Sequence, residues 1–148
     1  MTAQHLDAVM PHEIEMFGTE AWSRSAYLQE IAEPDSRAYF VMLDGEELLG
    51  WAGVRVVADE AEILTVGVVP AARRRGIGRA LLHALLDEAR RRHAADVFLE
   101  VRVDNDAARK LYETEGFTEL GLRRGYYDGG RVDAVTMHRG LGNRENHE

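Results

Sequence analysis

A basic, glycine-containing segment between a proline and an amphipathic stretch constrains the fold of this chain more than any other feature. The residues Arg-Arg-Arg-Gly-Ile-Gly-Arg occupy positions 73–79, shortly after an apolar run that ends at Pro70. Apolar residues then recur at helical spacing from Ile77 to about Arg92. Because proline cannot donate to a sheet ladder, the pattern predicts a strand, a tight basic loop and a helix that begins at Gly76 or Ile77.

The predicted helix start indicates a binding site for an anion. The first N–H groups of a helix lack partners within it and carry partial positive charge, while glycines allow a phosphate to approach the backbone closely. A dinucleotide-binding fingerprint would need a third glycine where Leu81 stands. A P-loop would need Gly-Lys-Ser/Thr, which the sequence lacks. Two interpretations remain at this point: a backbone cradle for an anionic ligand, and a solvated arginine loop.

Charge is unevenly distributed along the 148 residues. The net charge is −8, yet residues 71–100 hold seven arginines against four acidic side chains, while residues 1–70 hold thirteen acidic and three basic ones. A basic centre in an acidic protein favours an anionic ligand, and the acidic remainder argues against nucleic acid as the main partner. The acidic side chains near the N-terminus could attract a basic substrate or serve only solubility; among them are Glu13, Glu15, Glu20 and Glu30.

The composition excludes several chemistries. The chain has no cysteine, which rules out disulfides, cysteine nucleophiles and cysteine-bound zinc. Its six histidines show no metal-ligand spacing, and no serine lies in a Gly-x-Ser-x-Gly elbow, so we expect neither a metal site nor a covalent acyl-enzyme. No apolar run approaches the ~20 residues that span a bilayer, and the N-terminus lacks a signal-peptide pattern, so we expect a cytoplasmic protein.

Periodicity and turn residues predict a mixed order of elements. Stretches with helical spacing of apolar residues alternate with short apolar runs bounded by Gly, Pro, Asn or Asp. We expect a single domain over residues 1–139 and a polar, disordered tail over 140–148. This order indicates an α+β (mixed α/β) fold with a curved sheet around a long central helix. The expected helices are 6–17, 23–31, 76–92 and 105–115, and the expected strands are 39–43, 48–57, 61–69, 97–102, 117–122 and 132–138.

The segment from Val68 to Leu82 resembles the signature of the GCN5-related N-acetyltransferases (GNAT), whose core is Arg/Gln-x-x-Gly-x-Gly/Ala. The resemblance implies the GNAT fold, acetyl-CoA as co-substrate, and a loop whose backbone binds the coenzyme A pyrophosphate. It also implies that the preceding strand splays from its neighbour and pairs with the pantetheine arm. Asn105 resembles a cofactor-contacting asparagine of the family, although it could also be a helix N-cap. The implied cofactor-binding residues are Val66, Gly67, Val68, Arg74, Arg75, Gly76, Ile77, Gly78, Arg79 and Asn105.

A second segment, residues 98–117, narrows the resemblance to the ribosomal-protein-alanine N-acetyltransferases, the RimI branch of the family. It contains Leu-Glu-Val-Arg at 99–102 and Leu-Tyr-Glu-x-x-Gly-Phe at 111–117. The chemistry requires two proton handlers, because an α-ammonium with a pKa of ~7.7–8.0 must lose a proton and a thiolate must gain one. The resemblance assigns the first role to Glu100 and the second to Tyr112. Taken alone, a strand glutamate is more often solvent-facing and a helix tyrosine more often part of the core.

The resemblance extends from Trp22 to about Met137 and implies a substrate groove as well. Trp22 on one side, with Tyr126 and Tyr127 on the other, would contact a peptide N-terminus, although Trp22 could instead join two helices in the core. The chain departs from the family at its start, because a strand normally precedes the first helix and residues 1–5 leave only a stub. We therefore expect a sheet of six to seven strands, with the first edge strand missing or shortened.

Together these features predict an enzyme that transfers an acetyl group from acetyl-CoA to the N-terminal α-amine of a protein, by direct attack in a ternary complex. Its partner would be a protein or peptide N-terminus, for example that of a basic ribosomal protein, without direct contact to nucleic acid or membrane. Two alternatives stay open. One is a GNAT enzyme that acetylates a lysine side chain or a small-molecule amine. The other is a noncatalytic acyl-CoA-binding module, which the presence of both Glu100 and Tyr112 disfavours.

Overall fold

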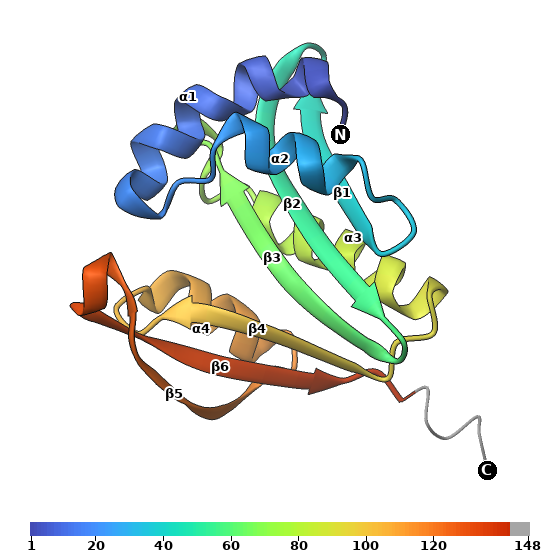
Figure 1. Ribbon diagram of the computed structural model, residues 1–148, viewed down its shortest axis with the longest axis vertical. Helices are drawn as coiled ribbons and strands as arrows, with labels where there is room; N and C mark the ends of the chain where they lie inside the picture. The colour runs from blue at the N-terminus through green and yellow to red at the C-terminus, as the bar shows by residue number, and fades with distance from the viewer. Residues whose placement is uncertain (143–148) are drawn as a thin grey trace.

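The computed structural model describes residues 1–142 and contains a six-stranded sheet with helices on both faces (Figure 1). The strands lie in the order β1-β2-β3-β4-β6-β5; β3 and β4 are parallel and the other neighbours are antiparallel. This mixed architecture confirms the predicted fold class. The strands are β1 (Arg37–Asp44), β2 (Glu47–Val57), β3 (Glu60–Val68), β4 (Asp96–Arg102), β5 (Thr118–Tyr127) and β6 (Val132–Gly140). The helices are α1 (Leu6–Phe17), α2 (Arg24–Ile31), α3 (Ile77–Arg91) and α4 (Asp106–Thr114).

The two parallel strands in the middle of the sheet separate after a short common base. β3 and β4 pair over three positions, the last of which joins Glu62 to Phe98. Directly beyond this point, the pairing of β2 with β3 shifts so that Leu64 is an extra residue, and such a bulge bends its strand. The rest of β3 and β4 therefore diverge into the V that Figure 1 shows. The expected splay between these strands is present.

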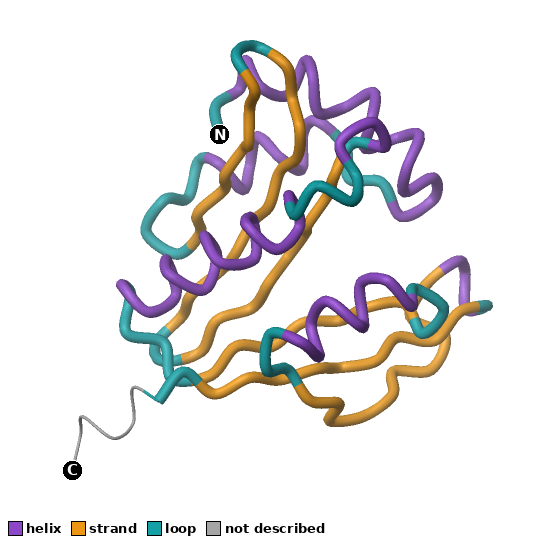
Figure 2. Tube along the Cα trace, turned by 180° about the vertical axis from the view of Figure 1, so that it is seen from behind, coloured by secondary structure: helices purple, strands orange, loops and turns teal. Residues whose placement is uncertain are grey.

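One side of the V, which we call the packed arm, consists of β1, β2, β3 and the helices α1, α2 and α3. The first two helices cover one face of these strands, and α3 covers the other (Figures 1 and 2). The apolar face of α3 packs on the sheet with Leu81 and Leu85 buried, as its helical spacing predicted. On the opposite face of the sheet, Trp51 of β2 and Tyr27 of α2 are fully buried where α1 and α2 cover the strands.

The other side, which we call the open arm, consists of β4, β5, β6 and α4. Only α4 covers this part of the sheet among the described helices (Figure 2). An ion pair between Arg109 and Glu119 joins α4 to β5. Along β5, the edge strand, residues 118–124 are all exposed, and they include Leu120 and Leu122. The open arm therefore has a much thinner apolar core than the packed arm.

Capping residues fix the helix boundaries close to where the sequence predicted them. The Ser23 hydroxyl accepts a hydrogen bond from the Ala26 N–H (3.0 Å) at the start of α2. The Asn105 side chain accepts one from the Ala108 N–H (3.2 Å) at the start of α4. Gly76 precedes α3 with φ +77°, a conformation that favours glycine. The helix and strand types agree with the predictions throughout, and most boundaries shift by only one or two residues.

The two ends of the chain concern the predicted edge strand and the predicted polar tail. No strand precedes α1 in the described chain; Ala3–His5 form a short helical turn, and the Met1 nitrogen donates to the Tyr39 carbonyl of the edge strand β1 (2.8 Å). At the other end, β6 continues to Gly140, further than expected. Residues 143–148 of the predicted tail lie outside the described residues. None of the helices in residues 1–142 is long and apolar enough to cross a membrane.

Candidate active site

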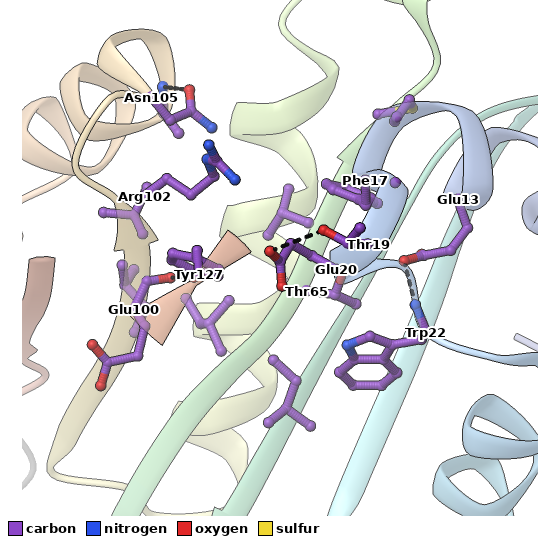
Figure 3. A pocket seen from close by; sticks show the side chains of 18 of the residues that line it. Glu13, Phe17, Thr19, Glu20, Trp22, Thr65, Glu100, Arg102, Asn105 and Tyr127 are labelled. Carbon is purple, nitrogen blue, oxygen red and sulfur yellow. Dashed lines mark hydrogen bonds between the residues drawn. The ribbon is translucent and has the colours of Figure 1, made fainter. Parts of the chain in front are cut away.

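A pocket of about 570 Å³ lies where the two arms diverge (Figure 3). The packed arm supplies the end of α1, the loop that follows it and the middle of β3. The open arm supplies the end of β4, the first turn of α4 and the end of β5. Of the predicted site residues, those that line the pocket are Trp22, Val66, Glu100, Asn105, Tyr112 and Tyr127. The fold thus collects candidates for cofactor, substrate and proton transfer at one opening.

Tyr112 of α4 is a buried tyrosine that lines this pocket. Its side chain is only 8% exposed and its ring packs edge-on against Phe117 (5.7 Å between centroids). Burial raises the pKa of the Tyr112 hydroxyl to about 12, so the phenol is protonated at neutral pH. Within residues 1–142 the hydroxyl has no hydrogen-bond partner, which leaves it available to a bound molecule. The tyrosine belongs to the core and also lines the pocket.

Glu100 of β4 lines the same pocket, but its carboxylate is held by the strands on the outer side. Oε2 accepts a hydrogen bond from the Thr136 hydroxyl of β6 (2.7 Å), the residue paired with Glu100 in the sheet. Oε1 accepts a longer one from the Arg123 guanidinium of β5 (3.4 Å). Figure 3 shows the carboxylate directed away from Thr65 across the opening. In this arrangement a proton from the pocket would reach Glu100 through water.

Of the two neighbouring tyrosines at the end of β5, only Tyr127 faces the pocket. Tyr127 lines the pocket, and its hydroxyl donates to the Glu100 carbonyl oxygen (3.3 Å). Burial raises the pKa of the Tyr127 hydroxyl above its ordinary value. Tyr126 is 45% exposed and lies outside the pocket, with the Arg123 guanidinium 4.4 Å from its ring centroid. Consecutive strand residues point to opposite faces, so only one of the pair can face the opening.

Trp22 follows α1 in the loop that borders the packed-arm side of the pocket. Its ring lies against Tyr27 (4.9 Å between centroids), so it does help to join the two N-terminal helices. It also lines the pocket. The expected packing between the two helices is therefore present, and the contact of Trp22 with a peptide stays a prediction.

The cofactor-binding candidates of β3 occupy the edge that faces the opening. Val66 lines the pocket, and Val68 lies close to the first turn of α3. Gly67 has a structural reason to be glycine: a Cβ there would stand 2.6 Å from the Trp51 ring, its cross-strand neighbour. The missing side chain makes room for the tryptophan on the face away from α3. The packing of Trp51 therefore explains why glycine stands at this position.

The basic loop lies beside the pocket, at the start of α3. Arg74 has φ +66° and precedes Gly76, so the backbone turns sharply into the helix. Arg73, Arg74 and Arg75 are exposed and form no ion pair within residues 1–142. A Cβ on Gly78 would lie 3.5 Å from Leu111 of α4, which places the start of α3 next to the open arm. The loop therefore presents both backbone N–H groups and free positive charge near the opening.

Arg79 differs from the other arginines of the loop, because its guanidinium is already paired. It contacts the carboxylate of Glu115 at the end of α4 and donates to the Thr114 hydroxyl (3.3 Å). His83, one turn later on α3, contacts the same carboxylate. The hydrogen bond with His83, supported by Arg79, lowers the pKa of Glu115 below its ordinary value. This cluster joins α3 to α4 across the opening.

The first 117 residues contain a match to a known family. The model of the acetyltransferase (GNAT) family matches residues 6–117 of the chain. This chain belongs to the GNAT family. The N-alpha-acetyltransferase RimI of Mycobacterium tuberculosis is 44% identical over 135 residues, which cover 88% of this chain and 83% of that protein. The [ribosomal protein bS18]-alanine N-acetyltransferase of Escherichia coli K12 is 43% identical over 100 residues, covering 66% of this chain and 68% of that protein.

Two solved structures share the fold of this chain. The crystal structure of the ribosomal-protein-S18-alanine N-acetyltransferase from Escherichia coli superposes with a TM-score of 0.84 and 34% identity, covering 95% of this chain and 90% of that one. The crystal structure of Ard1 from Thermoplasma volcanium gives a TM-score of 0.85 with 29% identity over 95% of this chain and 94% of that one. The predicted GNAT fold and N-acetyltransferase activity, with its resemblance to RimI, are confirmed.

The sequence did not reveal the part that Glu13 plays in this GNAT site. The sequence grouped it with three other acidic side chains as a candidate attraction for a basic substrate. In the structure Glu13 is buried, and Glu30 accepts hydrogen bonds from Arg37 and Tyr39 (both 2.8 Å). Only Glu15 and Glu20 of the four line the pocket while keeping exposed surface. A signal for the burial of Glu13 did exist, because it follows Leu6 and Val9 at helical spacing on the inner face of α1.

No group of three or more His, Asp or Glu side chains in residues 1–142 is arranged to hold a metal ion.

Proposed function

We propose that this chain acetylates the N-terminal α-amine of a cytoplasmic protein, and that the acceptor is a ribosomal protein that begins with alanine. The relatives named above carry this activity in their names, and one of them is 44% identical to this chain. The observation that supports the proposal most strongly is the shared pocket. Tyr112, Glu100 and Tyr127 border it on the open arm, and Trp22 borders it on the packed arm.

The residues at the opening suit acetyl-CoA as the co-substrate. Among the described residues 1–142, β3 has no strand partner on the β4 side beyond its base. Its backbone over Val66, Gly67 and Val68 can therefore pair with an extended amide-containing arm. The first N–H groups of α3 suit a pyrophosphate, with charge from Arg74 and Arg75. The proposed pyrophosphate cradle consists of Arg74, Arg75, Gly76, Ile77, Gly78 and Arg79. In it Arg79 contributes its backbone N–H, because its side chain pairs with Glu115.

Asn105 is compatible with both roles that its sequence suggests. Its Oδ1 is occupied as the N-cap acceptor for Ala108. Its side-chain NH₂ group is not used by that bond, and the residue lines the pocket. We propose that the cap fixes the rotamer and that the NH₂ group donates to the co-substrate.

The proposed chemistry divides two proton transfers between Glu100 and Tyr112. Acetyl-CoA supplies the acetyl group as an activated thioester. Glu100 accepts a proton from the α-ammonium, through water in the geometry seen here, so that the amine can form the new C–N bond. Tyr112, with a pKa of about 12, gives its proton to the sulfur as the C–S bond breaks. Once the C–N bond has formed, the nitrogen loses its second proton to solvent. Glu100 releases its proton to solvent and Tyr112 takes one back, so that one proton is released overall for each acetyl group transferred.

On the acceptor side, aromatic and acidic side chains face the same space. Trp22 and Tyr127 border the place of the first residue, and Glu15 and Glu20 supply negative charge for a basic segment. Tyr126 lies outside the pocket next to Tyr127, so we propose that it contacts the peptide beyond the first residue.

Three peptides test the proposed function directly. The first has an N-terminal alanine, several arginines and one internal lysine; the second has the same sequence with a blocked N-terminus; the third has the lysine replaced by arginine. We expect acetyl-CoA turnover with the first and third peptides, with the acetyl group mapped to the α-amine by mass spectrometry. Transfer to lysine alone would replace the proposal with the side-chain alternative. Coenzyme A binding without turnover of any amine would favour a noncatalytic module.

A further inference from the structure

Glu13 is a buried carboxylate at the edge of the pocket, and neither proton transfer uses it. The residue is 1% exposed and lies on the inner face of α1. Burial of a carboxylate is unfavourable unless hydrogen bonds replace its water, and a hydrophobic residue would fit this helix face more simply. The bonds that it forms therefore indicate what it does.

Each carboxylate oxygen of Glu13 holds a different segment. Oε2 accepts a hydrogen bond from the backbone N–H of Trp22 (3.0 Å), nine residues later in the chain. Oε1 accepts one from the hydroxyl of Tyr27 in α2 (2.5 Å). Figure 3 shows the first of these bonds at the pocket. Between α1 and α2, Thr19, Glu20 and Trp22 all line the pocket, so Glu13 fixes the end of the loop that carries the acceptor side.

The same network continues into the sheet. The Tyr27 hydroxyl accepts a hydrogen bond from Nε1 of Trp51 in β2 (3.1 Å). Burial, followed by the hydrogen bond to Glu13, raises the pKa of Tyr27 well above its ordinary value, so the phenol remains a donor. The Trp51 ring covers Gly67 of β3, where a Cβ would stand 2.6 Å away. A chain of contacts therefore connects the loop to the strand that borders the co-substrate side.

We propose that Glu13 is a positioning residue, which holds the loop of residues 18–22 at a fixed distance from β3 and so shapes the pocket for the acceptor N-terminus. This inference rests on the proposed function for its substrate. It assigns Glu13 no contact with the reacting atoms. Its effect falls on acceptor binding, because the loop borders that side, and it leaves the co-substrate cradle at α3 unchanged.

The chain offers a matched control for Glu13. Glu30 of α2 also accepts a hydrogen bond from a buried tyrosine hydroxyl, that of Tyr39 (2.8 Å), and it does not line the pocket. Glu30→Ala and Tyr39→Phe therefore remove a similar carboxylate–phenol bond from the packed arm. Both leave in place the Tyr39 ring, which packs edge-on against Trp22 (6.4 Å between centroids), and both keep the two hydrogen bonds of Glu13. Glu13→Ala and Tyr27→Phe remove the bonds of the proposed network.

The test measures the acceptor KM, kcat, the Kd of acetyl-CoA without peptide and the thermal unfolding of each variant. We expect Glu13→Ala to raise the peptide KM at least tenfold and to change the acetyl-CoA Kd less than twofold. Glu13→Gln should restore the KM to within about threefold of wild type, because its amide can accept from Trp22 and donate to the Tyr27 oxygen. Glu30→Ala should leave the peptide KM within twofold, whatever its effect on stability. A peptide KM within twofold of wild type in Glu13→Ala would overturn the proposal, as would an equal rise in Glu30→Ala.

Two further measurements keep the test decisive. If Glu13→Ala does not fold, Tyr27→Phe against Tyr39→Phe replaces it, and the proposal requires the peptide KM to rise at least threefold only in the former. The chain has two tryptophans, Trp22 and Trp51, and both belong to the network. Their emission should shift to longer wavelength in Glu13→Ala and not in Glu30→Ala, and no shift would contradict the network. Because emission needs no acceptor, it separates failure of this inference from a wild-type enzyme that proves inactive on peptide N-termini.

Discussion

The packed arm and the open arm of the sheet differ in how they are covered and in what they bring to the pocket. Helices cover both faces of β1–β3, whereas only α4 covers the described part of β4–β6. The packed arm supplies the loop and strand proposed to bind the two substrates. The open arm supplies Glu100 and Tyr112, the two proposed proton handlers. The comparison assigns both proposed proton handlers to the arm with the thinner core, and the proposed co-substrate strand and acceptor loop to the arm with helices on both faces.

The junction between the arms fixes how the two sets of residues meet. Three parallel residue pairs join β3 to β4 at the base of the V. Beside them, the Ala95 N–H donates to the Asp59 carbonyl (2.6 Å), and the Leu141 N–H donates to the Ala95 carbonyl (2.8 Å). Further along, the Arg79–Glu115–His83 cluster joins α3 to α4. The opening is therefore held at both its base and its side.

The largest expected effect is on catalysis from the open arm. Tyr112→Phe removes the proposed proton donor, and we expect kcat to fall roughly 10²- to 10³-fold, within the range of general acid catalysis. Tyr39→Phe, a buried tyrosine of the packed arm, should leave kcat within twofold. Because the protonated phenol is the active form and its pKa is about 12, raising the pH from 7 to 10 should not remove the wild-type donor. Steady-state rates over that range, for both variants, check the assignment; a Tyr112→Phe rate within threefold of wild type contradicts it.

The next effect is on stability and compares one leucine from each arm. Leu85 of α3 is 0% exposed and Leu122 of β5 is 50% exposed. We expect Leu85→Ala to lower the free energy of unfolding by ~2–5 kcal/mol and Leu122→Ala by less than ~1 kcal/mol, since only the first leaves a cavity. Urea unfolding followed by circular dichroism measures both. Equal losses would mean that the open arm has as firm a core as the packed arm.

A pair of strand glycines tests the same contrast with smaller changes. Gly67→Ala places a Cβ 2.6 Å from the Trp51 ring, and we expect it to cost ~1–3 kcal/mol of unfolding free energy. Gly121→Ala in β5 meets nothing within 4 Å, so its effect should stay within ~0.5 kcal/mol. If thermal unfolding shows no difference between the two, the Trp51 packing does not explain the glycine.

The smallest effect concerns the backbone cradle. Gly78 is the second residue of α3, where proline is compatible with a helix start, so Gly78→Pro removes one N–H with little damage to the fold. We expect the acetyl-CoA KM to rise roughly tenfold, and Arg75→Ala to raise it less than about fourfold, since a single exposed charge contributes less than ~1 kcal/mol. Comparable KM values for the two variants would show that charge matters as much as the backbone.

The sequence predicted the elements well because each had a local cause. Ser23 begins the predicted helix 23–31 and Asn105 was a candidate N-cap, and both accept capping hydrogen bonds. The period of α3 identified its buried face. The motifs in residues 73–79 and 98–117 then indicated the GNAT family, which the comparisons confirm. The catalytic and binding roles of individual residues remain predictions.

Features that depend on tertiary contacts could not be predicted in the same way. Glu13 looked like any surface acid until its partners Trp22 and Tyr27 were placed around it. Alternation along β5 allowed only one of Tyr126 and Tyr127 to face the pocket, but the sheet register selects which one.

A crystal structure with coenzyme A and an alanine-first peptide tests the division between the arms most directly. We predict that the pantetheine arm lies between β3 and β4, with the pyrophosphate at residues 76–79 and the sulfur within hydrogen-bond reach of the Tyr112 hydroxyl. The peptide amine should lie on the side of Trp22, connected to Glu100 directly or by water. Coenzyme A bound outside the V, or a sulfur on the far side of the sheet from Tyr112, would contradict the account.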